Sequence, residues 1–375
     1  MKFIRFTLTI MIAAAALIFS SCEDGNSTSY VQRNKVVILN QGNYTEQNAS
    51  VYMYDEDSKE LTVNAYSKAN NGTKLGATLM SGTYSNTGVG YLLCANPDKL
   101  ETVNVLTMGT IANPVTEGLL NTREVVAGDG YLFVTNAGEN PVDVGGGYYE
   151  YPESFVSIYN ISSSYAPILV DKINVGSDAQ GMAYADGTLY VGTKAGIVMI
   201  SKQGADFVKD DVYTDEVYKG AVKYLCVSGD YIYASVPGYG VFKYDPSKGK
   251  ATDYTEMTLS YDGFITADAA GNIYSYATTY APDWSVESSD AYKLNVETGV
   301  VSKVATGEYL YSIGVSPYSG HVFTSEANGF YTNSTMNITD IATGNHIDTK
   351  TTGVGTFRYL FFSYLDIENP TTDKK

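Results

Sequence analysis

Residues 130–136 read GYLFVTN, a glycine turn followed by a short run of β-branched and aromatic residues. This pattern is typical of a β-strand that leaves a tight turn. It recurs as GYLLCAN (90–96), GTLYVGT (187–193), DYIYASV (230–236), GNIYSYA (271–277) and GHVFTSE (320–326), and KVVILNQ (35–41) fits the same place near the N-terminus. The seven copies are spaced by about 47 residues on average, which lies within the range of propeller blades.

A second element follows each copy and has the pattern of a hairpin, with alternating apolar residues, a polar turn and another β-rich run. The hairpins cover residues 50–63, 100–111, 155–173, 196–208, 240–254, 291–304 and 336–350. Seven repeats of about four strands predict an all-β fold, a seven-bladed β-propeller. The run GTFRYLFFSYL (355–365) is expected to complete the first blade, so that N- and C-terminal strands close the propeller. The alternative is a pair of β-sandwich domains with coincidental spacing.

The N-terminal 21 residues have a basic start, an apolar stretch and small residues at the end, which is the pattern of an export signal peptide. The small pair Ser20-Ser21 before Cys22 resembles a bacterial lipobox. We therefore expect Cys22 to carry a lipid and to anchor the protein to a membrane. The alternative is an ordinary signal peptide with an incidental cysteine.

The acidic pair Glu23-Asp24 resembles the tags that send lipoproteins to the outer face of the outer membrane. The expected location is thus the outer membrane, with the protein facing the cell exterior. We expect residues 22–34 to form a flexible tether, residues 35–368 the propeller and residues 369–375 a polar tail.

The composition excludes several classes of function. The chain of 375 residues carries 24 basic and 41 acidic side chains, a net charge of −17, so nucleic acid is not an expected partner. With 2 His and 3 Cys, neither a histidine metal site nor a disulfide framework is expected. No catalytic motif is present, so we expect no enzyme, no metal and no intrinsic cofactor. An enzyme that uses only carboxylates stays open as an alternative.

Insertions lengthen one topological position, between the first and second element of a repeat, at residues 41–49, 137–154, 278–290 and 327–335. One decorated face is therefore expected, and aromatic residues gather there as a contact surface. The candidate binding residues in these and shorter loops are Asn43, Tyr44, Tyr148, Tyr149, Tyr151, Tyr239, Tyr280, Trp284 and Tyr331. Alternatively, some of these aromatic side chains fold back over the blades as loop anchors.

A second set of candidates comes from the expected inner strands. Counting back seven residues from the turn of a repeat gives Arg123, Gln180, Lys223 and Phe264. Allowing for longer turns adds Tyr311, and Arg358 opens the expected closing strand. These side chains are expected to ring the mouth of the central channel, where the three cations would bind anionic or amide-rich groups. Alternatively, each cation pairs with an acidic neighbour and holds adjacent blades together.

Three segments, ILNQGNYTEQNASVYMYD (38–55), NNGTKLGATL (70–79) and NTREVVAGDGYLFVTN (121–136), resemble YncE-like propeller lipoproteins of Bacteroidota. The BtuG-type members of that group capture cobalamin and pass it to a TonB-dependent transporter, the BtuB-like partner. The resemblance implies that the bound ligand is cobalamin or another corrinoid. A siderophore-binding propeller, a propeller enzyme acting on polysaccharide and a protein-interaction scaffold stay open as alternatives.

Overall fold

The computed structural model describes residues 29–283 and 285–368. Residues 34–362 form one compact unit, and the described residues 29–33 and 363–368 belong to a second. The expected signal peptide, Cys22, Trp284 and the tail 369–375 lie outside the described residues. In the part of the chain that is described, no helix is both long and apolar enough to cross a membrane.

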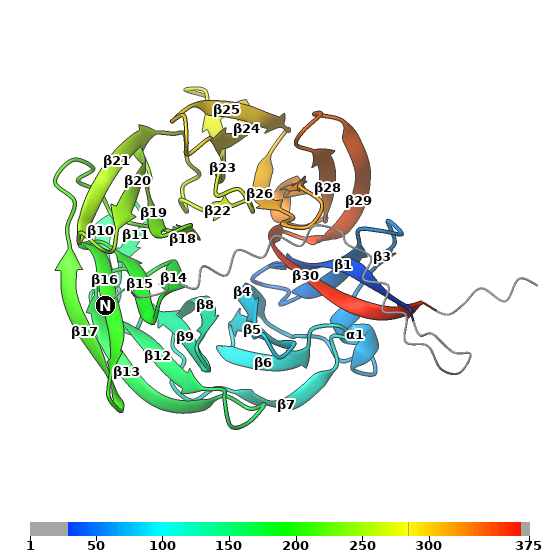
Figure 1. The fold of residues 1–375 in the computed structure, drawn as a ribbon, viewed down its shortest axis with the longest axis horizontal. Helices are drawn as coiled ribbons and strands as arrows, with labels where there is room; N and C mark the ends of the chain where they lie inside the picture. The colour runs from blue at the N-terminus through cyan, green and yellow to red at the C-terminus, as the bar shows by residue number, and fades with distance from the viewer. Residues whose placement is uncertain (1–28, 284, 369–375) are drawn as a thin grey trace, which may run out of the picture. The chain divides into compact units, whose positions relative to one another are not determined.

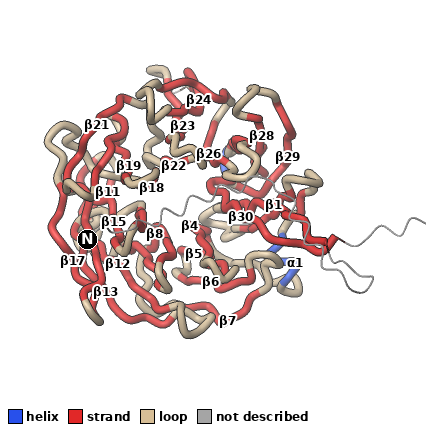
Figure 2. Tube along the Cα trace, viewed as in Figure 1, coloured by secondary structure: helices blue, strands red, loops and turns tan. Residues whose placement is uncertain are grey.

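The described residues form seven four-stranded antiparallel sheets and one two-stranded ribbon (Figure 1). Nearly all of the regular structure is strand (Figure 2). The first sheet combines the first and the last described strands, in the order β3 (Leu61–Thr62), β2 (Ser50–Asp55), β1 (Ser29–Asn40) and β30 (Thr356–Glu368).

The other sheets follow the chain, and each begins with its innermost strand. The second contains β4 (Thr78–Tyr84), β5 (Val89–Ala95), β6 (Lys99–Asn104) and β7 (Thr110–Val115). The third contains β8 (Thr122–Gly128), β9 (Tyr131–Asn136), β12 (Ser154–Asn160) and β13 (Ile168–Gly176). The ribbon of β10 (Val142–Gly145) and β11 (Tyr148–Glu150) lies between β9 and β12 in sequence.

The fourth sheet contains β14 (Met182–Ala185), β15 (Thr188–Thr193), β16 (Gly196–Gln203) and β17 (Asp206–Tyr213). The fifth contains β18 (Leu225–Ser228), β19 (Tyr231–Val236), β20 (Gly240–Asp245) and β21 (Lys250–Glu256). The sixth contains β22 (Ile265–Ala267), β23 (Ile273–Tyr280), β24 (Val286–Leu294) and β25 (Val301–Thr306). The seventh contains β26 (Leu310–Val315), β27 (His321–Glu326), β28 (Asn333–Asp340) and β29 (His346–Val354).

The innermost strands contact one another in chain order, from β4 through β8, β14, β18 and β22 to β26. Strand β30 lies between the two ends of this series. The Tyr84 hydroxyl on β4 donates a hydrogen bond of 2.6 Å to the Phe361 carbonyl, and Gly314 on β26 faces the rings of Tyr359 and Phe361. The sheets of residues 34–362 are therefore arranged around a common centre (Figure 1). This arrangement and the all-β content confirm the prediction of a β-propeller.

The burial of each strand follows from its place in the sheet. Second strands such as β5 and β9 are buried along almost their whole length, because a neighbouring sheet covers each face. Outermost strands such as β13 alternate between exposed and covered residues. Apolar clusters fill the spaces between sheets; one of them joins Leu93 of β5, Val125 of β8 and Val134 of β9.

Two local features differ from the sequence-based expectation. A short helix, α1 (Ala65–Ala69), buries Ala65 and Tyr66, although the sequence predicts an all-β fold. Five residues are too few to produce a helical period in the sequence. Strand β1 begins at Ser29, so residues 29–34, which the sequence assigned to the tether, belong to a strand.

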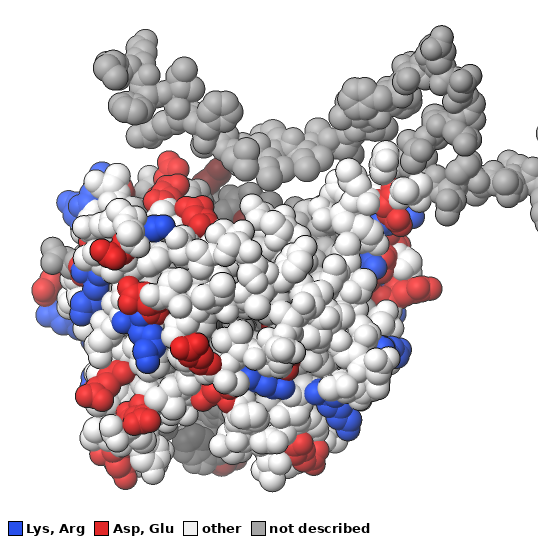
Figure 3. Space-filling model, turned by 90° about the horizontal axis from the view of Figure 1, so that it is seen from below, with Lys and Arg blue, Asp and Glu red and all other residues white. Residues whose placement is uncertain are grey.

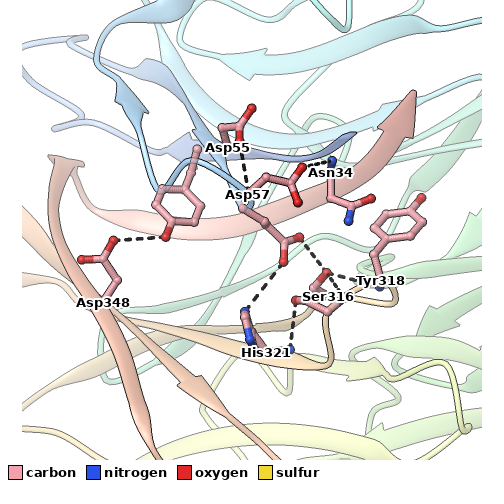
Figure 4. Close-up of polar contacts among 10 residues, drawn as sticks. Asn34, Asp55, Asp57, Ser316, Tyr318, His321 and Asp348 are labelled. Atoms are coloured by element: carbon pink, nitrogen blue, oxygen red, sulfur yellow. Dashed lines mark hydrogen bonds and ion pairs between the residues drawn. The ribbon is translucent and has the colours of Figure 1, made fainter. Parts of the chain in front are cut away.

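The seam between the first and seventh sheets contains a buried acidic side chain. Ser316 and His321 point toward the same carboxylate (Figure 4), that of Glu56, which is 3% exposed. Ser316 Oγ donates to Glu56 Oε1 at 2.7 Å, and His321 Nδ1 lies 3.9 Å from Oε2. The Oε2 atom has no hydrogen-bond partner. A carboxylate oxygen that is buried without a hydrogen-bond donor is destabilising.

We therefore expect Glu56→Gln to be more stable than the unaltered protein by about 1 kcal/mol, because it removes a buried charge without a full partner. Thermal unfolding measures this, with Asp57→Asn, an exposed neighbour, as control. A lower melting temperature for Glu56→Gln than for Asp57→Asn would contradict the expectation.

Candidate functional site

The six inner-strand candidates all lie on innermost strands or within two residues of them. Arg123 is on β8, Tyr311 on β26 and Arg358 on β30. Phe264 directly precedes β22, while Gln180 and Lys223 lie two residues before the first residues of β14 and β18. Backbone hydrogen bonds link some of these positions across sheets, because Gly181 N donates to the Lys223 carbonyl at 2.8 Å. The repeat therefore places one candidate on or next to the innermost strand of six sheets, and the second sheet supplies none.

Arg358 lies in a cage of aromatic rings. Its guanidinium carbon is 3.6 Å from the centroid of the Phe264 ring and 4.9 Å from that of Tyr224. Arg358 Nη2 donates a hydrogen bond of 2.5 Å to the Tyr224 hydroxyl. Since Arg358 belongs to the first sheet and Tyr224 to the fifth, this hydrogen bond spans the centre around which the sheets are arranged.

Two acidic side chains, Glu124 and Asp262, act electrostatically on the same guanidinium. Burial by itself would lower the pKa of Arg358, but its pKa is raised because Tyr224, Glu124 and Asp262 stabilise the positive charge. Burial likewise raises the pKa of Tyr224 well above its ordinary value. Glu124 also accepts a hydrogen bond from Ser81 Oγ of the second sheet. Arg358 therefore fits the alternative interpretation of the cations, in which a cation is balanced by acidic neighbours and links sheets to one another.

Tyr311 connects the seventh sheet to the first. Its hydroxyl donates a hydrogen bond of 2.7 Å to Gln41 Oε1, and its ring meets Phe330 edge-on with centroids 4.7 Å apart. Burial raises the pKa of Tyr311 to about 12, so this hydroxyl is a neutral donor at physiological pH.

A cleft of about 740 Å³ opens beside this group, where the first, second, third and seventh sheets meet. The loop 41–44 and the turn 95–98 form part of its wall, with Thr78, Asn121, Arg123, Tyr151 and Phe330. Four predicted residues therefore line one cavity: Asn43, Tyr44, Arg123 and Tyr151. The Arg123 guanidinium lies 5.4 Å from the centroid of the Tyr151 ring and donates to the Thr122 carbonyl at 3.2 Å.

Asn43 and Asp98 shape the wall of the cleft. Asn43 Oδ1 accepts hydrogen bonds from the backbone N–H of Thr45 and Glu46, and its Nδ2 donates to the Phe330 carbonyl at 3.2 Å. Asp98 accepts from the backbone N–H of Asn121 and Thr122 at 2.8 and 3.1 Å. Asn43 therefore has the bonding of a loop anchor, and Asp98 positions the segment that carries Arg123.

The remaining aromatic candidates are exposed but do not line this cleft. Tyr148 and Tyr149 lie on β11, where the Tyr148 ring approaches Tyr261 with centroids 6.4 Å apart. Tyr239 packs on Tyr218, and the Tyr280 hydroxyl donates to that of Tyr309 at 3.2 Å. Tyr331 is 78% exposed. Gln180 and Lys223 are half-buried, and neither lines this cleft.

Sequence reasoning did not select Thr78 or Tyr224 as candidates, although each is a neighbour of predicted residues here. Tyr224 directly follows Lys223 in the chain, and Thr78 lies in the segment NNGTKLGATL. The chain has 34 tyrosines, so one tyrosine by itself does not indicate a binding site, and neither does one threonine in a β-rich run.

Comparison with solved structures shows the fold. No family model matches the chain, and no curated protein matches its sequence. A 6-phosphogluconolactonase candidate from Bacteroides fragilis has a TM-score of 0.60 at 10% identity, with 88% of this chain and 98% of that chain covered. AztD from Citrobacter koseri has a TM-score of 0.55 at 10% identity, covering 89% and 99%. A protein from Lactobacillus plantarum has a TM-score of 0.57 at 13% identity, covering 88% and 99%. These likenesses support membership of the β-propeller class.

Proposed function

We propose that this protein is a surface lipoprotein, built as a closed seven-bladed propeller, that captures a bulky nutrient without chemical turnover. The proposed ligand is cobalamin or another corrinoid, and the proposed recipient is a TonB-dependent transporter of the BtuB-like kind. The observation that carries the proposal is the cleft of about 740 Å³ with Arg123, Tyr44 and Tyr151 in its wall.

The chemistry of the wall supports a ligand of this kind. A corrinoid is broad, fringed with amides and carries one phosphate diester, so it needs flat aromatic contacts and several hydrogen-bond donors. The cleft supplies the rings of Tyr44, Tyr151 and Phe330 and the donors of Asn96 and Arg123. The hydrogen bond between Arg358 and Tyr224 spans the centre, so a ligand would rest at the mouth rather than pass through.

The proposed partners follow from the sequence. A lipid on Cys22 would hold the protein at the outer membrane, where a transporter could receive the cargo. Acidic and basic side chains are interspersed on the face seen in Figure 3, which supports a partner other than nucleic acid.

A binding titration of the purified full-length protein tests the proposal. We expect cyanocobalamin to bind in a saturable manner and a ferric catecholate siderophore to bind more weakly. If only the siderophore binds, the proposed ligand is a siderophore and not a corrinoid. If neither ligand binds, the proposal that the protein captures these nutrients is wrong, and the next assay tests whether it degrades polysaccharides.

The aromatic wall gives a sharper expectation. Tyr44→Ala should weaken cyanocobalamin binding by about tenfold while leaving the melting temperature unchanged, because the Tyr44 side chain is 70% exposed. Tyr165→Ala is the matched control, since Tyr165 is similarly exposed in the β12–β13 turn, at the opposite end of the strands. Equal affinity for both variants would remove Tyr44 from the site.

A further inference from the structure

The outermost strand of the first sheet is much shorter than those of the other sheets. Strand β3 contains two residues, whereas the outermost strands of the other six four-stranded sheets contain six to nine. It pairs only with Met53 and Tyr54 of β2, so residues 50–52 have no strand on their outer side. Helix α1 follows β3 and contacts β2. The sheet is therefore open at the place where its outermost strand would continue.

A pocket of about 350 Å³ lies at this opening. Its lining comes from residues 48–52, from α1 and the segment after it, and from the seventh sheet. Tyr52 and Tyr66, both buried, contribute to the lining. No described residue lines both this pocket and the cleft of about 740 Å³. The pocket is therefore a cavity separate from that cleft.

The pocket presents polar side chains that have no partner within the described part of the protein. Asn64, Lys74 and Asn333 are exposed in its lining, and their side chains make no hydrogen bond or ion pair with any described residue. Ser50 and Ser67 add two half-buried hydroxyls. Amides and hydroxyls both donate and accept hydrogen bonds, so this lining suits a ligand that is rich in hydroxyl groups.

The charge of the pocket is opposite to that of the whole protein. Among the described residues that line it, Lys74 alone carries a charge, in a chain with a net charge of −17. An ammonium group without an acidic partner favours a ligand with a negative charge. Because one lysine balances one such charge, the pocket suits a singly charged ligand.

We propose that this pocket binds a sugar that carries a single anionic group, a carboxylate or a sulfate. Lys74 pairs with the anionic group, while Asn64, Asn333 and the two serines bind the ring hydroxyls. The volume lies near the lower end of the range for small-molecule pockets, which suits one or two sugar rings. A longer β3 would fill this space, so the site accounts for a strand of two residues. The inference goes beyond the proposed capture of a corrinoid and does not depend on it.

Calorimetric titration of the full-length protein compares three sugars that differ in one group. Methyl glucuronide carries a carboxylate, methyl glucoside 6-sulfate carries a sulfate, and methyl glucoside is neutral. We expect at least one of the charged sugars to bind about threefold to fivefold more tightly than the neutral one, which is the difference that an exposed ion pair supplies. The sugar that binds most tightly identifies the anionic group.

Two variants assign the charge and the amide to this binding. Lys74→Met should bind all three sugars with equal affinity, because the ammonium is lost. Lys68→Met is the matched control and should keep the preference, since Lys68 is exposed on α1 but does not line the pocket. Asn64→Gly preserves the left-handed backbone at φ +51° and removes the amide, so it should weaken the binding of all three sugars by about threefold.

Three results would overturn the inference. They are the absence of saturable binding for both charged sugars, equal affinity for charged and neutral sugars, and a preference that Lys74→Met retains. Cyanocobalamin separates this pocket from the proposed function, because Lys74→Met should bind it as tightly as the unaltered protein does. If cyanocobalamin does not bind while a charged sugar binds with the expected preference, corrinoid capture is wrong and the sugar site stands.

Discussion

Replacing Arg358 by Met is expected to lower the free energy of unfolding by about 3–5 kcal/mol. The substitution keeps much of the side-chain volume but removes the charge that Tyr224, Glu124 and Asp262 surround. It also removes the donor to the Tyr224 hydroxyl and the cation above the Phe264 ring. The carboxylates of Glu124 and Asp262 would then share the centre with no cation to balance them.

Chemical denaturation of Arg358→Met beside Arg123→Met measures this effect. Arg123 donates only to the neighbouring Thr122 carbonyl and contacts the Tyr151 ring, so its variant should lose less than about 1 kcal/mol. Arg358→Lys should be intermediate, because an ammonium keeps the charge but does not stack on rings as a guanidinium does. Adding Glu124→Gln to Arg358→Met should restore part of the stability. If Arg358→Met were as stable as the unaltered chain, the guanidinium would not link the sheets.

Gly196→Ala is expected to cost about 3 kcal/mol or more. Gly196 begins β16 with φ +126°, and a Cβ atom there would overlap the carbonyl oxygen of Tyr213 on the adjacent strand. Two costs therefore add, because the backbone conformation is strained for an L-residue and the sheet must also open. Gly240 at the start of β20 has φ +144° and the same relation to the Thr255 carbonyl, so Gly240→Ala should behave alike.

Gly109→Ala is the matched control for these two variants. Gly109 has no positive φ, and its nearest neighbour is the Thr107 hydroxyl at 3.4 Å from the added Cβ. Its melting temperature should change little, while those of Gly196→Ala and Gly240→Ala should fall by several degrees. Equal melting temperatures for all three variants would contradict the close strand approach.

The repeat in the sequence was sufficient to predict the sheets. Runs such as GYLFVTN lie on second strands, because a strand covered on both faces must be apolar along its whole length. Helix α1 escaped prediction because its five residues leave no periodic trace. The ribbon of β10 and β11 also escaped, since its exposed side chains resemble those of any polar loop.

The candidate site was only partly predictable, for a physical reason. Counting from the turns placed Arg123 and Tyr311 on innermost strands, and Arg358 was found at the start of the expected closing strand, because the strand period fixes which residue reaches a given level. It did not predict that Arg358 would be paired with Tyr224 while Arg123 keeps free donors. That difference depends on contacts between sheets that are distant in the sequence, and the spacing of residues within a repeat does not predict such contacts.

Strand β30 has a consequence for how the protein is made. A chain that is synthesised from its N-terminus completes β1, β2 and β3 first, yet their sheet lacks its innermost strand until residues 356–362 are made. Until then β1 keeps an unpaired edge, and β4 and β26 have no partner between them. A chain that terminates before β30 would therefore keep unpaired strand edges, and such edges favour aggregation with other chains.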